Sequence, residues 1–225
     1  MTISSKDKEN KPKPEKKVCW FCGKEVELVS SWDGWEAPDV HQECEQMTQE
    51  YKRIGIDPLF WKLPVFKVEQ GNKTAFEAVE RFIKNPTNKG LFLFGKAGTG
   101  KTHLAVKIAQ EVKSLRVRFI KVPRLLLELK SNFDGKGWEN EQIIDRLANV
   151  DLLILDDLGA EKASEWVAET IFVLIDERYG NMRPTIITSN LSPDELVERL
   201  GDRIFSRIAG TCEVIEIKSS DKRKS

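Results

Sequence analysis

The feature that most constrains this chain is a glycine-rich stretch between an apolar run and a segment of helical periodicity. The apolar run spans residues 91–94, and the helical segment begins near Lys101. Between a buried strand and a helix N-terminus, glycines let backbone N–H groups close around phosphate groups. The sequence therefore predicts a nucleoside triphosphate site, and a glycine turn that precedes a helix by chance is the weaker interpretation. The stretch has the pattern Gly, four free positions, Gly-Lys-Thr, and comprises Gly95, Lys96, Ala97, Gly98, Thr99, Gly100, Lys101 and Thr102.

Two side chains of this stretch suit the phosphates and their metal ion. Lys101 is placed to reach the β- and γ-phosphates, and the Thr102 hydroxyl is placed to hold Mg²⁺. We therefore expect ATP and Mg²⁺ as ligands.

A second apolar run, at 152–155, ends in two acids, Asp156 and Asp157. This pattern is typical of a buried parallel strand that delivers carboxylates to a phosphate site. We expect Asp156 beside the Mg²⁺ shell, and we expect Asp157 to polarise the attacking water as a general base. Acids that merely cap the following turn are the alternative, but a glycine-rich phosphate loop already requires such a strand.

Strands and helices alternate along the rest of the chain, which predicts an α/β fold with a parallel sheet. The ligand of such a sheet lies at the carboxyl ends of its strands. Asn190, at the polar end of a β-branched run, should therefore face the same crevice as the glycine-rich stretch. We expect helices at 72–85, 123–133, 138–148 and 165–179, and strands at 91–94, 116–121, 152–155, 184–190 and 212–217.

A separate set of residues near the N-terminus has zinc-ligand spacing. Cys19 and Cys22 form a Cys-x-x-Cys pair before a glycine, and His41 and Cys44 form a second close pair. Three thiolates and one imidazole suit tetrahedral Zn²⁺, and four protein ligands leave no open coordination position, so the ion would be structural. A redox pair or a disulfide is less favoured, because the second pair contains a histidine and cytosolic thiols stay reduced. Cys212 lies alone in an apolar strand and is interpreted as a core residue.

Charge and composition divide the chain into segments. Lys and Arg number 36, as do Asp and Glu, so the net charge indicates nothing about nucleic acid. We expect a disordered leader at 1–17, a zinc-binding module at 18–50, a linker at 51–66, a nucleotide-binding domain at 67–218 and a basic tail at 219–225. No stretch has the apolar length of a membrane span or a signal peptide, so we expect a cytoplasmic protein with no membrane partner.

Taken together, the motifs resemble the DnaC/DnaI/IstB group of AAA+ ATPases over about residues 66–218. The glycine-rich stretch, the segment from Asp156 to Glu161 and the segment 185–190 carry the resemblance. It implies a five-stranded parallel AAA+ sheet, with Asn190 as the sensor that reads the γ-phosphate and orients water. Arg207 resembles the arginine finger that enters a neighbouring subunit's site, with Arg203 as second choice, and a surface ion pair is the alternative for either. The Cys/Cys/His/Cys module resembles the helicase-grip domain of DnaI-like loaders.

The resemblance implies an ATP-dependent loader that places a replicative DnaB-type helicase on single-stranded DNA in replication initiation or restart. The chain would self-associate with ATP, and its ATP hydrolysis to ADP and phosphate would be weak until assembled, because the finger comes from the next protomer. An IstB-like ATPase helper of a transposase is one alternative. A zinc adaptor with a merely structural nucleotide is another.

Overall fold

The computed structural model describes residues 17–26, 29–31, 34–36, 40–131 and 137–219 of the 225-residue chain. The chain divides into two compact units, 1–52 and 53–225. The leader predicted at 1–17 and the tail predicted at 219–225 lie outside the described residues, apart from Lys17 and Ser219. The other segment boundaries stay predictions.

The first unit contains a two-stranded antiparallel hairpin and the start of a helix. Strands β1 (Val29–Ser31) and β2 (Gly34–Glu36) pair with each other, and helix α1 spans Gln42–Ile54. The Cys-x-x-Cys turn closes through two backbone bonds, from Cys19 N to Lys24 O at 2.8 Å and from Gly23 N to Cys19 O at 2.9 Å. Gly23 has a φ of +76°, a left-handed conformation that favours glycine.

The second unit alternates helices and strands as the sequence predicts. The ends of the predicted elements lie within two residues of the observed ones, and residues 132–133 of the helix predicted at 123–133 lie outside the described part. In chain order the elements are η2 (Pro58–Phe60), α2 (Lys73–Lys84), β3 (Gly90–Phe94), α3 (Lys101–Glu111), β4 (Val117–Lys121), α4 (Val122–Ser131), α5 (Gly137–Asn149), β5 (Leu152–Asp156), α6 (Glu165–Gly180), β6 (Thr185–Ser189), α7 (Pro193–Leu200), α8 (Asp202–Thr211) and β7 (Cys212–Glu216).

The five strands of this unit form one parallel sheet in the order β4-β5-β6-β3-β7. This confirms the predicted five-stranded parallel fold. Because all the strands run the same way, their carboxyl ends meet at one edge of the sheet. The glycine-rich stretch after β3, the acids at the end of β5 and Asn190 after β6 are therefore neighbours, although they are far apart in sequence.

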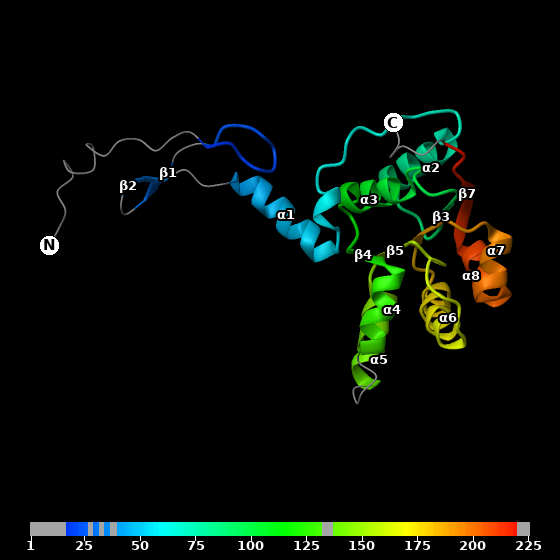
Figure 1. The fold of residues 1–225 in the computed structure, drawn as a ribbon. Coiled ribbons are helices and arrows are strands. Elements are labelled where there is room, and N and C mark those ends of the chain that lie inside the picture. Colours follow the sequence, from blue (N-terminus) through cyan, green and yellow to red (C-terminus); the bar gives the residue numbers. More distant parts are fainter. Residues whose placement is uncertain (1–16, 27–28, 32–33, 37–39, 132–136, 220–225) are drawn as a thin grey trace. The chain divides into compact units, whose positions relative to one another are not determined.

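Helices cover both faces of this sheet, with α2 and α3 on one side and α4, α6 and α8 on the other (Figure 1). Alternate strand residues face the larger of the two layers, among them Phe92, Leu153, Leu155 and Ile187, which pack in one buried cluster with residues of α4 to α8. Burial on both faces explains why these strands are almost continuously apolar. None of the described helices has the length and apolar character that crossing the bilayer requires.

A buried arginine joins the layers at the amino end of β6. Arg178 is 1% exposed, and its guanidinium donates to Leu147 O, Ala148 O, Val150 O and Pro184 O and to Thr185 Oγ1. These bonds satisfy carbonyls at the end of α5 and fix the start of β6. Burial lowers the pKa of Arg178 to about 9.

Candidate nucleotide and metal sites

The glycine-rich loop that leads from β3 to α3 needs glycine at two positions for space as well as conformation. Gly95 and Gly100 have φ values of +144° and +97°. A Cβ atom at Gly95 would lie 2.3 Å from Ile217 O, and one at Gly100 would lie 2.8 Å from Phe66 Cε2. A side chain at position 95 would push the loop away from the backbone of Ile217, and at position 100 the left-handed backbone conformation itself favours glycine.

Lys101 lies inside this loop rather than in solvent. Its side chain is buried, and Nζ donates to Gly95 O and Lys96 O, each at 2.7 Å. Thr99 closes the same turn from the other side, since its hydroxyl donates to Lys96 O at 3.0 Å. The ammonium group is thus held where phosphates enclosed by the loop would meet it.

Asp156, the last residue of β5, is fully buried, and only one of its two carboxylate oxygens accepts hydrogen bonds from the described residues. Its Oδ1 accepts hydrogen bonds from Thr102 Oγ1 at 2.9 Å and Thr188 Oγ1 at 2.7 Å. Its Oδ2 is buried and has no hydrogen-bond partner among the described residues. The pKa of Asp156 is raised to about 6, chiefly by burial, with hydrogen bonds from the Thr188 and Thr102 hydroxyl groups opposing the shift and the charge of Asp157 adding to it. A buried carboxylate oxygen without a donor, beside a hydroxyl, fits a hydrated Mg²⁺ ion.

Asp157 follows directly in an unusual backbone conformation. Its φ is +59°, in the left-handed region that few residues other than glycine adopt. Its N–H donates to Thr188 Oγ1 at 3.0 Å, and the next N–H, of Leu158, donates to Thr188 O at 2.9 Å. The chain therefore turns sharply where β5 ends, and the half-buried Asp157 side chain starts from that turn.

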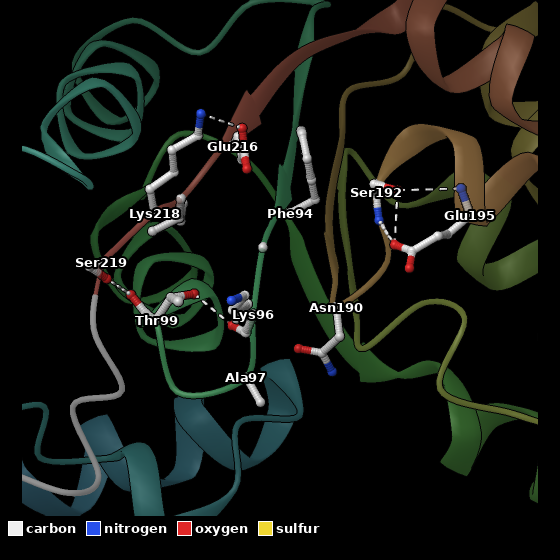
Figure 2. Close-up of a pocket in the computed structure, with 12 residues that line it drawn as sticks. Phe94, Lys96, Ala97, Thr99, Asn190, Ser192, Glu195, Glu216, Lys218 and Ser219 are labelled. Atoms are coloured by element: carbon white, nitrogen blue, oxygen red, sulfur yellow. Dashed lines mark hydrogen bonds and ion pairs between the residues drawn. The ribbon is translucent and has the colours of Figure 1, made fainter.

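A pocket of about 750 Å³ opens over the loop, which is large enough for a nucleotide. Figure 2 shows Asn190 across this pocket from Lys218, with its side chain directed toward the loop. The structure thus brings Asn190 to the same cavity as the glycine-rich loop. The lining residues are Phe94, Gly95, Lys96, Ala97, Thr99, Asn190, Ser192, Glu195, Glu216, Ile217, Lys218 and Ser219.

One wall of this pocket was missed by the sequence interpretation. The segment that leaves β7 bonds to the loop and to the chain before α2: Ser219 Oγ donates to Thr99 O at 3.0 Å, and Lys218 N donates to Gly71 O at 2.8 Å. Lys218 also forms an ion pair with Glu216 at 3.0 Å. The sequence carries no local signal for this wall, because its position depends on β7 pairing with β3.

The two candidate finger arginines lie on α8 and do not line the pocket. Arg207 Nε donates to Asp176 Oδ1 at 2.7 Å, and its guanidinium lies 4.8 Å from the centre of the Tyr179 ring. Arg203 lies over the Phe172 ring at 4.3 Å. Both arginines are therefore held against α6 of their own chain, and a role in another chain's site stays a prediction.

The four residues with zinc-ligand spacing come together in the first unit. The ligand atoms of Cys19, Cys22, His41 and Cys44 all lie within 4.8 Å of one another, and the cysteines form no disulfide. His41 Nε2 lies 3.0 Å from Glu25 O, which leaves Nδ1 toward the thiols, 3.3 Å from Cys22 Sγ. A backbone carbonyl that orients the second ring nitrogen is common for metal-bound histidine, so the donor set fits Zn²⁺.

Cys212, by contrast, lies buried in β7, as expected of a core residue. Burial raises the pKa of its thiol to about 12, which keeps it protonated and unreactive.

Comparisons with known proteins agree with this geometry. The model of a family described as "IstB-like ATP binding protein" matches residues 74–225. The replicative helicase loader DnaC of Escherichia coli strain K12 is 31% identical over 170 residues, which cover 72% of this chain and 69% of that protein. A crystal structure of the DnaC helicase loader has a TM-score of 0.64 at 32% identity, over 72% of this chain and 100% of that one. A structure of the replication initiator DnaA bound to AMPPCP and single-stranded DNA has a TM-score of 0.61 at 27% identity, over 69% of this chain and 49% of that one.

Proposed function

The chain belongs to the family of IstB-like ATP-binding proteins, and we propose that it hydrolyses ATP and loads a replicative DnaB-type helicase onto single-stranded DNA. The observation that carries the proposal is the arrangement at the carboxyl edge of the sheet, where Lys101 bonds to the glycine-rich loop, Asp156 bonds to Thr102 and Asn190 lines the pocket over the loop. Similarity to DnaC, a protein described as a replicative helicase loader, supports the loader role.

Each group at this edge has a role in phosphoryl transfer to water. Lys101 and the loop N–H groups would bind the phosphates, and Thr102 with Asp156 would hold Mg²⁺. The ion, when bound, neutralises negative charge on the phosphate oxygens. Asp157 would accept the proton of the attacking water, and Asn190 would orient that water against the γ-phosphate.

Hydrolysis would become efficient only when copies of the chain assemble. Arg207 would supply positive charge to the γ-phosphate of a neighbouring copy, with Arg203 as second choice. The partly exposed position of its side chain on α8 supports this role, because a guanidinium group at the surface can reach another copy of the chain. ATP-dependent self-association would then control the activity.

The first unit would bind the helicase. Cys19, Cys22, His41 and Cys44 would hold Zn²⁺ as a structural ion in a module at 18–50, followed by a linker at 51–66 and an ATPase domain at 67–218. The close donor set and the small size of the unit support this assignment, because such modules seldom fold without a metal.

Contact with single-stranded DNA would be sequence-independent and mediated by the ATPase domain. The likeness to DnaA bound to single-stranded DNA supports this capacity in the shared fold. An IstB-like ATPase helper of a transposase is the second candidate, and the description of the matching family model favours it.

The direct test is helicase loading onto closed single-stranded circles, which a ring-shaped helicase cannot thread by itself. Full-length chain, the replicative helicase of the same organism and ATP are mixed with circles, and the helicase that co-elutes with DNA is quantified. We expect ATP-dependent co-elution that Lys101→Ala abolishes. Loading onto circles that is equal without this chain would contradict the proposal, and stimulation of a co-encoded transposase instead would favour the second candidate.

A further inference from the structure

Thr188, on β6, contacts both acids at the end of β5 through a single hydroxyl group. Oγ1 donates to Asp156 Oδ1 at 2.7 Å and accepts from the backbone N–H of Asp157 at 3.0 Å. The side chain is 0% exposed, so no solvent competes for these bonds. A threonine hydroxyl has one hydrogen to donate and lone pairs to accept with, and here each capacity is used by a different neighbour.

We propose that Thr188 is a positioning residue for ATP hydrolysis, which aims Asp157 at the attacking water and fixes the Asp156 carboxylate for Mg²⁺. The inference rests on the proposed ATPase function and assigns this residue a role within it.

The backbone of Asp157 provides the first argument. A left-handed φ such as its +59° costs free energy in a residue other than glycine, and persists only where surrounding contacts enforce it. Thr188 supplies two of these contacts, one from its hydroxyl to Asp157 and one from its carbonyl to Leu158. Because the backbone conformation of Asp157 sets the direction of its side chain, Thr188 sets the direction of the base.

The Asp156 carboxylate provides the second argument. Thr188 and Thr102 both donate to Oδ1, which leaves Oδ2 as the buried oxygen without a partner among the described residues. Two donors on one oxygen restrain the rotation of the carboxylate. Without the Thr188 hydroxyl only Thr102 would restrain it, so its alignment with a bound ion would weaken.

The position of Thr188 along β6 provides the third argument. Asn190 lies two residues further on, and between them Ser189 Oγ donates to Leu158 O at 2.6 Å. The end of β6 is therefore joined to the Asp157–Leu158 turn at several points. A displacement of the end of β6 would be transmitted to the turn at Asp157. Asp157 and Asn190 therefore keep a fixed relative position.

The test compares Thr188→Val, which keeps the side-chain shape without its hydroxyl, with Thr188→Ser, which keeps the hydroxyl. Thr170→Val is the matched control, because it removes a half-buried α6 hydroxyl whose bond is local, to Trp166 O at 2.8 Å. Three quantities are measured on the full chain: kcat and KM for ATP hydrolysis, and the ratio of the Kd for fluorescent ATP in EDTA to that in Mg²⁺.

We expect Thr188→Val to lower kcat by about 10- to 100-fold, because misplacement of a catalytic group costs rates of this order, and to raise KM in step with the Kd for ATP in Mg²⁺. We expect its EDTA-to-Mg²⁺ Kd ratio to fall toward one, while Thr188→Ser and Thr170→Val keep wild-type values of kcat, KM and this ratio. Wild-type values in Thr188→Val, or equal losses in the valine and serine variants, would overturn the inference.

The Kd ratio separates this inference from the proposed function. A wild-type chain that binds ATP without hydrolysing it would contradict the ATPase proposal, yet the ratio would still report whether Thr188 fixes Asp156. Should Thr188→Val not fold, Thr188→Ala is compared with Thr188→Ser instead. Both variants shorten the side chain, and only the serine variant keeps the hydroxyl group. A loss confined to the alanine variant supports the inference, and equal losses contradict it.

Discussion

The Thr102 hydroxyl lies 2.9 Å from Asp156 Oδ1, across 54 residues of sequence, and donates to it. With its hydrogen committed to the carboxylate, the Thr102 oxygen keeps its lone pairs for a cation. The first turn of α3 and the last residue of β5 are thus joined by the hydroxyl and carboxylate groups that we propose as Mg²⁺ ligands.

The buried Asp156 carboxylate should destabilise the metal-free protein above pH 6. Its folded pKa of about 6 exceeds the unfolded value of 3.8, so its contribution to stability is favourable below pH 3.8 and is lost as pH rises through 6. Asp156→Asn, which removes the charge, should therefore have a free energy of unfolding in EDTA at pH 7 that is higher than that of the wild type by up to about 3 kcal/mol, and a higher unfolding temperature. Thermal unfolding of both proteins at pH 4 and pH 7 checks this. A stability difference between Asp156→Asn and the wild type that is as large at pH 4 as at pH 7 would contradict it.

Asp157→Asn should bind ATP with wild-type affinity and fail to turn it over. A carboxamide keeps the size of the side chain but accepts no proton, and loss of a general base costs about 10²- to 10⁴-fold in rate. The Kd for fluorescent ATP and the rate of phosphate release measure the two properties separately. Hydrolysis at the wild-type rate would exclude Asp157 as the base and would favour a nucleotide with a purely structural role.

Arg207→Ala should lower by at least tenfold the rate of hydrolysis that depends on assembly. An arginine finger is worth about 10³- to 10⁵-fold in other phosphoryl-transfer enzymes, so the loss should be at least tenfold here. Because Arg207 also pairs with Asp176, the control is Asp176→Asn, which breaks the ion pair and keeps the guanidinium.

The finger role predicts that Asp176→Asn keeps most of the activity, whereas equal losses in the two variants would assign Arg207 a structural role. Mixing Arg207→Ala with Lys101→Ala provides a second check. In the mixture, a nucleotide site with Lys101 from the Arg207→Ala chain can receive Arg207 from a neighbouring Lys101→Ala chain. Activity should therefore return.

Removal of the metal should separate helicase binding from ATP binding. Elemental analysis should find one zinc ion per chain, and Cys22→Ser should lose it, whereas Cys212→Ser should keep it because that thiol is buried in β7. The zinc-free variant should still bind ATP, since the glycine-rich loop belongs to the other compact unit. If the zinc-free variant still binds the helicase, the first unit is not the part of the chain that binds it.

Much of this architecture follows from local sequence. The glycine-rich loop, the acids after β5 and the four zinc-type residues are recognisable because each group depends on short spacings and on the end of one strand. Parallel pairing then brings Asn190 to the loop, as the alternation of strands and helices predicts. Strand ends could be placed to within two residues because apolar runs end where the strands leave the core.

The remainder depends on contacts between distant residues. The sequence around Arg178 does not indicate that this side chain is buried, because its partners are carbonyl groups at the end of α5 and before β6. The bond from Ser219 to Thr99 joins residues 120 apart, and the pair of Arg207 with Asp176 depends on how α8 crosses α6. In the sequence Thr188 is an ordinary β-branched strand residue, because its bonds to Asp156 and Asp157 arise only from the pairing of β6 with β5.

The central claim is that ATP and magnesium bind together at the loop between β3 and α3. Isothermal titration of the full chain with ATP in Mg²⁺ tests it most directly, with Lys101→Ala as the variant and the exposed Lys113→Ala as its control. We predict one ATP per wild-type chain, unchanged binding in Lys113→Ala and none in Lys101→Ala. No heat of binding in the wild type, or equal binding in all three proteins, would contradict the account.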